Sequence, residues 1–211
     1  VYPTEPVKLP GNNKPQKSTQ EQIDDAVDLI NNSEKPVILA GHGILLSGAS
    51  REVIKLAETA SIPIGWTLLG SGSIPASHPL NMGMMGMHGE FAVNNAIQKA
   101  DLLIACGMRF DDRVTGNVKT YSPDSKKIHI DIDPSSINKV VNVDVALVGD
   151  VADVLEDAIK LWKSKVYKIN KSLLKTSNGC KKLTIFDIRS RLYEATSCTS
   201  CLLYTSPNPR D

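Results

Sequence analysis

Residues 86–116 read GMHGEFAVNNAIQKADLLIACGMRFDDRVTG. This pattern predicts a glycine-containing loop, a helix over 91–99, a buried strand over 101–107 and a charged loop. Parallel α/β sheets bind their ligands just beyond the carboxyl ends of the strands. The ionisable side chains at the ends of this helix–strand unit are therefore candidate binding residues: His88, Arg109, Asp111, Asp112 and Arg113.

The rest of the sequence repeats this alternation of apolar runs and amphipathic segments. Further strands are predicted at 36–40, 62–67, 127–133 and 144–148. Further helices are predicted after a capping box of Ser18 and Glu21, and over 49–60 and 151–163. Residues 68–86 are predicted to form a long loop. Five strands, at least four helices and no hairpin signal predict a doubly wound parallel α/β sheet.

Two features of these elements fit more than one interpretation. Gly41, His42 and Gly43 follow the first predicted strand, where they suit either a phosphate-cradling turn or a tight turn without a ligand. Asp131 and Asp133 end the strand 127–133. Acids at that place bind ribose hydroxyls or a metal ion, or else cap the turn that follows.

The composition excludes several classes of protein. With 41% hydrophobic and 22% charged residues, the chain has the balance of a soluble globular protein. Its apolar runs are all far shorter than the roughly 20 residues of a membrane span. Four scattered cysteines form no disulfide framework, which favours the cytoplasm. Cys106 fits a buried strand, and the isolated Cys198–Cys201 pair lacks the partners of a metal site.

Four segments divide the chain. Residues 1–17 form a proline-containing linker, and residues 18–164 form one α/β domain. Residues 165–200 form an irregular extension with a short helical stretch near 185–194, and CLLYTSPNPRD at 201–211 resembles the translated read-through of a sequencing adapter. Residues 165–211 carry 9 Lys and Arg against 3 Asp and Glu, without the interleaved aromatic residues of a nucleic-acid-binding arm. No nucleic-acid or membrane partner is expected.

Several motifs together, in order and spacing, carry a family resemblance. Residues 86–89 (GMHG), 107–116 (GMRFDDRVTG) and 128–134 (IHIDIDP) are similar to the central domain of acetolactate synthase large subunits. The resemblance covers roughly residues 20–163 and implies a fragment of such an enzyme, with a Rossmann-like fold. In this family the central domain binds FAD in an extended form.

The resemblance also implies which residues contact FAD. Glycines would let the backbone approach the phosphates, Arg109 and Arg113 would lie near the flavin and pyrophosphate, and Asp131 would meet the adenosine ribose. The implied FAD-binding positions are Gly41, His42, Gly43, Thr67, Leu68, Met87, His88, Gly107, Arg109, Asp111, Arg113, Val114, Asp131 and Asp150.

The family reaction condenses two pyruvates, or pyruvate and 2-ketobutyrate, with loss of CO2. It requires thiamine diphosphate and Mg2+, whose catalytic and metal-binding residues lie in flanking domains, so no catalytic or metal-binding residue is assigned here. The resemblance further implies 2-keto acid substrates, a homo-oligomer, a regulatory subunit and a cytoplasmic location. Trp66 and Met108 replace smaller residues that are usual in the family, and Trp66 is placed where it would crowd the flavin.

Two alternatives remain open from the sequence. One is another thiamine diphosphate-dependent enzyme, of the pyruvate oxidase or glyoxylate carboligase type, although related enzymes seldom keep the whole run Arg109–Arg113. The other is a non-catalytic nucleotide-binding module, in which those charges would form a solvated salt-bridge loop.

Overall fold

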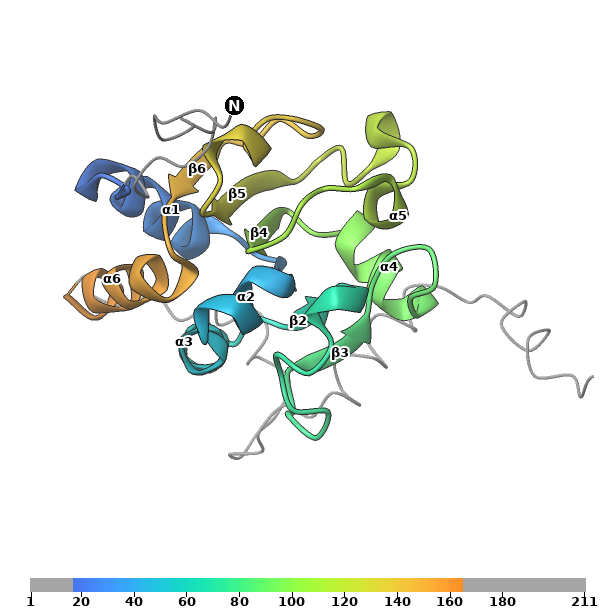
Figure 1. Ribbon diagram of the computed structural model, residues 1–211, viewed down its shortest axis with the longest axis horizontal. Helices are drawn as coiled ribbons and strands as arrows, with labels where there is room; N and C mark the ends of the chain where they lie inside the picture. The colour runs from blue at the N-terminus through green and yellow to red at the C-terminus, as the bar shows by residue number, and fades with distance from the viewer. Residues whose placement is uncertain (1–16, 165–211) are drawn as a thin grey trace, which may run out of the picture.

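Six parallel strands form one sheet within residues 17–164, the part of the chain that the computed structural model describes. Their order is β3-β2-β1-β4-β5-β6, which is that of a doubly wound dinucleotide-binding fold and confirms the predicted fold class (Figure 1). The strands are β1 Pro36–Ala40, β2 Ile64–Trp66, β3 Asn81–Met84, β4 Leu102–Cys106, β5 Lys126–Asp131 and β6 Val145–Val148. The interpretations of residues 1–16, 165–200 and 201–211, with the Cys198–Cys201 pair and the stretch near 185–194, fall outside the described residues.

Helices cover both faces of this sheet. In Figure 1, α1, α3 and α6 lie together on one side of the strands, and α4 lies on the other. The helices are α1 Gln20–Asn32, α2 His42–Ser47, α3 Ser50–Ala60, α4 Phe91–Gln98, α5 Asp112–Thr115 and α6 Val151–Ser164. Short 3-10 turns connect them at η1 Leu68–Gly70, η2 Val118–Thr120 and η3 Pro134–Ser136. No helix in residues 17–164 is both long enough and apolar enough to cross a bilayer.

Alternate residues of the central strands face two separate cores. In β4, Leu102 and Ile104 pack toward α1, α3 and α6, whereas Leu103 and Ala105 pack toward α4. Strands covered on both faces need apolar residues at every position. This is why the continuous apolar runs, rather than alternating ones, marked the strands in the sequence.

The first helix begins one residue later than predicted. Thr19, not Ser18, is the N-cap: its side chain accepts a hydrogen bond from Gln22 N, and the Gln22 side chain accepts one from Thr19 N. Ser18 instead donates to the carbonyl of Val148 at 3.1 Å. The pattern S/T-x-x-E/Q fits both registers here, so the assignment of Ser18 and Glu21 was wrong.

The predicted count of five strands was also wrong, because β3 lies within the predicted loop 68–86. Two of its features hide it. Its four residues, NMGM, have low β-propensity, and it pairs with β2 at the edge of the sheet across a register shift. Only the partner strand makes this segment a strand.

Candidate functional site

The two central strands end side by side at the point where the connections diverge. The chain leaves β1 toward β2 and leaves β4 toward β5, so the carboxyl ends of β1 and β4 form the switch point of the sheet. Gly41 N donates to Cys106 O at 2.9 Å, and Gly43 N donates to Gly107 O at 2.8 Å. These bonds join the turn after β1 to the turn after β4.

Glycines are required here because the two turns cross in contact. A Cβ on Gly41 would overlap Gly107 O and the Met108 side chain, and a Cβ on Gly43 would lie 2.6 Å from Gly107 Cα. The turn at Gly41–Gly43 therefore has a packing reason independent of any ligand. It also starts the short helix α2, which no pattern in the sequence predicts, and His42 is exposed at its first position.

Thr67 and Leu68 lie next to this switch point. Thr67 N donates to Ala40 O at 2.9 Å, and the Thr67 hydroxyl caps η1 by accepting from Gly70 N at 3.1 Å. The side chain of Leu68, 69% exposed, is available to an apolar surface.

Trp66, the last residue of β2, contacts the neighbouring strand. The indole Nε1 donates to the Asn81 Oδ1 at 3.0 Å, and Asn81 is the first residue of β3. The indole packs against the core on the α1, α3 and α6 side. Asn81 of β3 thus fixes the position of the indole ring, through a contact that no local sequence pattern predicts.

Two loops meet at the same edge of the sheet. We call residues 84–90 loop A and residues 107–116 loop B. Met87 N donates to Arg113 O at 2.8 Å, and a Cβ added to Gly86 would lie 2.7 Å from that same oxygen and 3.5 Å from Val114 Cα. The loops therefore bring Gly86 and Met87 beside Arg113 and Val114.

Loop B presents two arginines to solvent. The side chains of Arg109 and Arg113 are 70% and 73% exposed. Arg109 pairs with Asp111 at 3.0 Å and Arg113 with Asp112 at 3.8 Å. Exposed ion pairs of this kind contribute only about 0–1 kcal/mol, so an anion can replace these carboxylates at little cost.

A buried histidine of β5 contacts loop B, and it is not among the predicted binding residues. The His129 side chain in β5 is fully buried, with Nε2 2.8 Å from Met108 O and its ring edge-on to Phe110 at 5.2 Å. Burial lowers the pKa of His129, against smaller opposing effects of the Met108 bond and the Asp131 carboxylate. The neutral ring then donates from Nε2 to Met108 O. A histidine between two isoleucines was the available signal.

The acids at the ends of β5 and β6 have partly structural roles. Asp133 accepts from Ser135 N at 2.9 Å, which confirms the capping alternative, and hydrogen bonds from Ser135 lower the pKa of Asp133. Asp150 accepts from Ala152 N at 2.9 Å at the start of α6. Asp131, nearly buried, accepts from Asp133 N at 2.9 Å, and its carbonyl accepts from Gly149 N at 3.0 Å.

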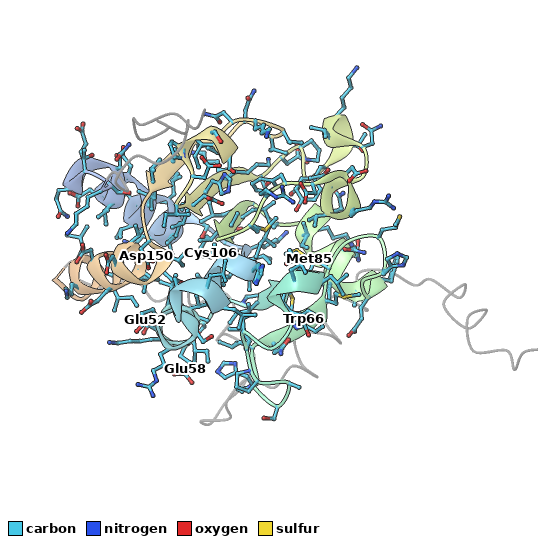
Figure 2. All side chains as sticks on the ribbon, in the orientation of Figure 1. Glu52, Glu58, Trp66, Met85, Cys106 and Asp150 are labelled. Carbon is cyan, nitrogen blue, oxygen red and sulfur yellow. The ribbon has the colours of Figure 1, made fainter. Side chains whose placement is uncertain are left out.

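All the predicted binding residues thus lie along one edge of the sheet. Figure 2 shows Asp150, Cys106 and Met85 one after another; Asp150 and Met85 come after β6 and β3, and Cys106 is the last residue of β4. Five strand spacings of about 4.8 Å make this edge roughly 24 Å long. Cys106 is a core residue, as predicted, and burial raises the pKa of its thiol to about 12. Residues 17–164 contain no group of three or more His, Cys, Asp or Glu that could hold a metal ion.

Comparison with known proteins identifies the family. The family described as thiamine pyrophosphate enzyme, central domain, matches residues 23–158. A probable acetolactate synthase large subunit of Methanocaldococcus jannaschii is 45% identical over 176 residues, which cover 78% of this chain and 30% of that relative. One from Methanococcus aeolicus is 48% identical over 154 residues, covering 73% of this chain and 26% of that relative.

A bacterial relative gives the same result. The acetolactate synthase large subunit of Corynebacterium glutamicum is 44% identical over 164 residues, which cover 78% of this chain and 26% of that protein. The chain therefore spans between a quarter and a third of the length of these curated relatives. The match over residues 23–158 and the strand order place the chain in the thiamine pyrophosphate enzyme family, as a central domain.

Proposed function

We propose that this chain is the central part of an acetolactate synthase large subunit, and that it binds FAD. The names of its relatives support the enzyme, and their greater length supports a chain that is part of a larger protein. The proposal keeps residues 18–164 as the binding domain and leaves residues 1–17, 165–200 and 201–211 outside it. The complete enzyme would condense two pyruvates, or pyruvate with 2-ketobutyrate, in branched-chain amino acid biosynthesis.

The residues at the carboxyl edge fit an extended dinucleotide. The observation that carries the proposal is the contact of loop A with loop B, which sets exposed Met87 beside the exposed guanidinium of Arg113. An apolar surface next to cations suits a ring system joined to a pyrophosphate. Leu68, which follows β2, adds exposed apolar surface on the same side of the switch point as Met87, and Asp131 is an acceptor for a ribose hydroxyl.

The proposed FAD contacts follow the order of the strands. Met87, His88, Thr67 and Leu68 would contact the flavin and ribityl part, and Arg109, Asp111, Arg113 and Val114 the pyrophosphate side. Gly41, His42, Gly43 and Gly107 would line the phosphates, and Asp131 and Asp150 the adenosine. Because Gly41 N and Gly43 N already donate to the turn after β4, their part is close approach of the backbone rather than donation.

The remaining proposals concern the complete enzyme. Thiamine diphosphate, bound with Mg2+ by other domains, supplies the carbanion chemistry of the reaction. Its substrates would be small 2-keto acids, and it would act in the cytoplasm as a homo-oligomer with a regulatory subunit. In this proposal, residues 18–164 bind and orient FAD, and the catalytic groups lie in the other domains of the enzyme.

The colour of the purified protein tests the proposed function. We expect the full-length protein that carries this chain to be yellow and to release FAD when it is denatured, as measured by absorbance and fluorescence of the supernatant. A colourless protein that added FAD does not reconstitute would contradict the proposal.

Arg109→Ala tests the proposed contact with the pyrophosphate. Removing a charged hydrogen-bond donor costs about 1.5–3 kcal/mol, so the dissociation constant of FAD should rise roughly tenfold or more. Lys119→Ala, at an exposed cation of η2, is the matched control and should leave FAD binding unchanged. Titration of the apoenzyme with FAD measures both. Equal effects of the two substitutions would exclude this role for Arg109.

A further inference from the structure

Gly86, at the centre of loop A, depends on one side chain from α4. The residue is buried and has a φ of +98°. Its N–H donates to Asn94 Oδ1 at 2.9 Å, and its carbonyl accepts from Asn94 Nδ2 at 2.9 Å. The carbonyl also accepts from Gly89 N at 2.9 Å. Among the described residues, Asn94 therefore provides the only acceptor for the buried N–H of Gly86.

This pair of bonds determines where loop A meets loop B. Met87 directly follows Gly86 and donates to Arg113 O. Gly86 itself packs so closely against Arg113 O that a side chain would not fit there. A change in the backbone at Gly86 would consequently move Met87 away from Arg113.

Asn94 is suited to hold this contact because α4 is firmly packed. Val93, Ala96 and Ile97 of the same helix are buried in the core on that face of the sheet. The helix thus provides a fixed point, and the Asn94 amide transmits its position to loop A through one donor and one acceptor. A primary amide is the side-chain group that can pair with both groups of one peptide residue in this way.

We propose that Asn94 is a positioning residue, which holds loop A against loop B and so fixes Met87 and His88 for the cofactor. This inference rests on the proposed FAD site. In it, Asn94 contacts neither the cofactor nor loop B and acts only through loop A. Without the Asn94 amide, the buried N–H of Gly86 loses its partner, and the cofactor must order loop A when it binds. Such ordering reduces affinity.

Asn95 offers a matched control. It is the next residue of α4, has the same side chain and is likewise half-buried, and the described part of the chain gives its amide no hydrogen-bond partner. Replacing either asparagine by alanine changes helix propensity equally. Asn94→Asp is a milder second variant, since it keeps an acceptor for Gly86 N–H and loses only the donor.

Two measurements on the full-length protein test the proposal. The first is amide hydrogen exchange of residues 86–88 in the FAD-free protein, and the second is the dissociation constant of FAD. For N94A we expect exchange at least tenfold faster and FAD binding about tenfold weaker, as loss of a buried hydrogen bond implies. N95A should change either quantity less than twofold. N94D should lie between wild type and N94A in both.

The exchange measurement and the FAD-binding measurement distinguish a failure of this inference from a failure of the proposed function. Wild-type exchange rates in both N94A and N94D would overturn the inference whether or not FAD binds. It would also be overturned if N94A exchanged faster yet bound FAD as tightly as N95A, because Asn94 would then be structural only. A wild-type protein that binds no FAD would instead overturn the proposed function, while the exchange arm would still decide whether Asn94 holds loop A closed.

Discussion

Gly107→Ala is expected to lower the free energy of unfolding by about 3–5 kcal/mol, a larger loss than we expect from any other substitution proposed for this chain. Two costs add. Gly107 has a φ of +57°, which a residue with a Cβ adopts at a cost of about 1–2 kcal/mol. The added Cβ would also lie 2.6 Å from Gly43 Cα, a backbone atom that cannot rotate away.

The consequence extends to both central connections. Gly107 N donates to Ile130 O, and Gly107 O accepts from Gly43 N, so the residue joins the ends of β1, β4 and β5. Separating the turns would weaken these bonds as well as the packing. Urea denaturation, followed by far-UV circular dichroism, measures the change in the free energy of unfolding.

Gly48→Ala separates the two costs. Gly48 has a φ of +69°, but a Cβ added there would meet no atom within 4 Å, so only the backbone cost of about 1–2 kcal/mol applies. We expect the loss at position 107 to exceed that at position 48 by about 2 kcal/mol or more. Equal losses would show that the two turns can move apart, and that the switch point is not held by close packing.

Replacing His129 is expected to remove a pH dependence of stability worth up to about 2 kcal/mol between pH 7 and pH 5. Burial lowers the pKa of His129 below its ordinary value near 6.5, although the Met108 carbonyl and the Asp131 carboxylate favour the proton. Below that ordinary value the unfolded chain binds the proton more readily than the folded one. The stability that the neutral His129 contributes is therefore fully present above about pH 6.5, and it is lost as the pH falls below that value.

Two variants distinguish the proton from the hydrogen bond. His129→Gln keeps an N–H for Met108 O and cannot titrate, so its stability should fall less between pH 7 and pH 5 than that of the wild type. His129→Leu removes the donor, and at pH 7 it should be less stable than His129→Gln by about 1–3 kcal/mol. Urea denaturation at both pH values provides the measurement. If the free energy of unfolding of His129→Gln depended on pH as strongly as that of the wild type, titration of His129 would be ruled out as the cause.

The fold could be predicted wherever a segment carries its own pattern. The continuous apolar runs of β1 and β4 and the amphipathic face of α6 predict these elements correctly, because burial on two faces or one face requires those residues. β3 lacks such a pattern, and it forms a strand because it pairs with β2 at the edge of the sheet. The start of α1 at Thr19 was missed for a different reason, since two registers of one capping pattern overlap.

The candidate site divides in the same way. The glycines and charged residues of 86–116 predict a binding site there, which stays a prediction, and the structure brings Met87 next to Arg113. The roles of Asn94 and His129 could not be predicted, although His129 between two isoleucines is unusual, because each bonds a backbone carbonyl or N–H of another segment. Hydrogen bonds from a side chain to the backbone of another segment cannot be predicted from residue types, because nearly every residue has the same backbone groups.

The sequence by itself determined that this chain is a parallel α/β domain with its charged and glycine-containing segments at the carboxyl ends of strands. Hydrophobic periodicity and loop composition are local properties, and they are sufficient for that conclusion. Only the tertiary structure decided that Gly41 and Gly43 cross Gly107, that Trp66 turns toward Asn81, and that loop A is joined to loop B. These are contacts between strands and loops far apart in the chain, whose steric fit and hydrogen bonds exist only once the sheet has been assembled.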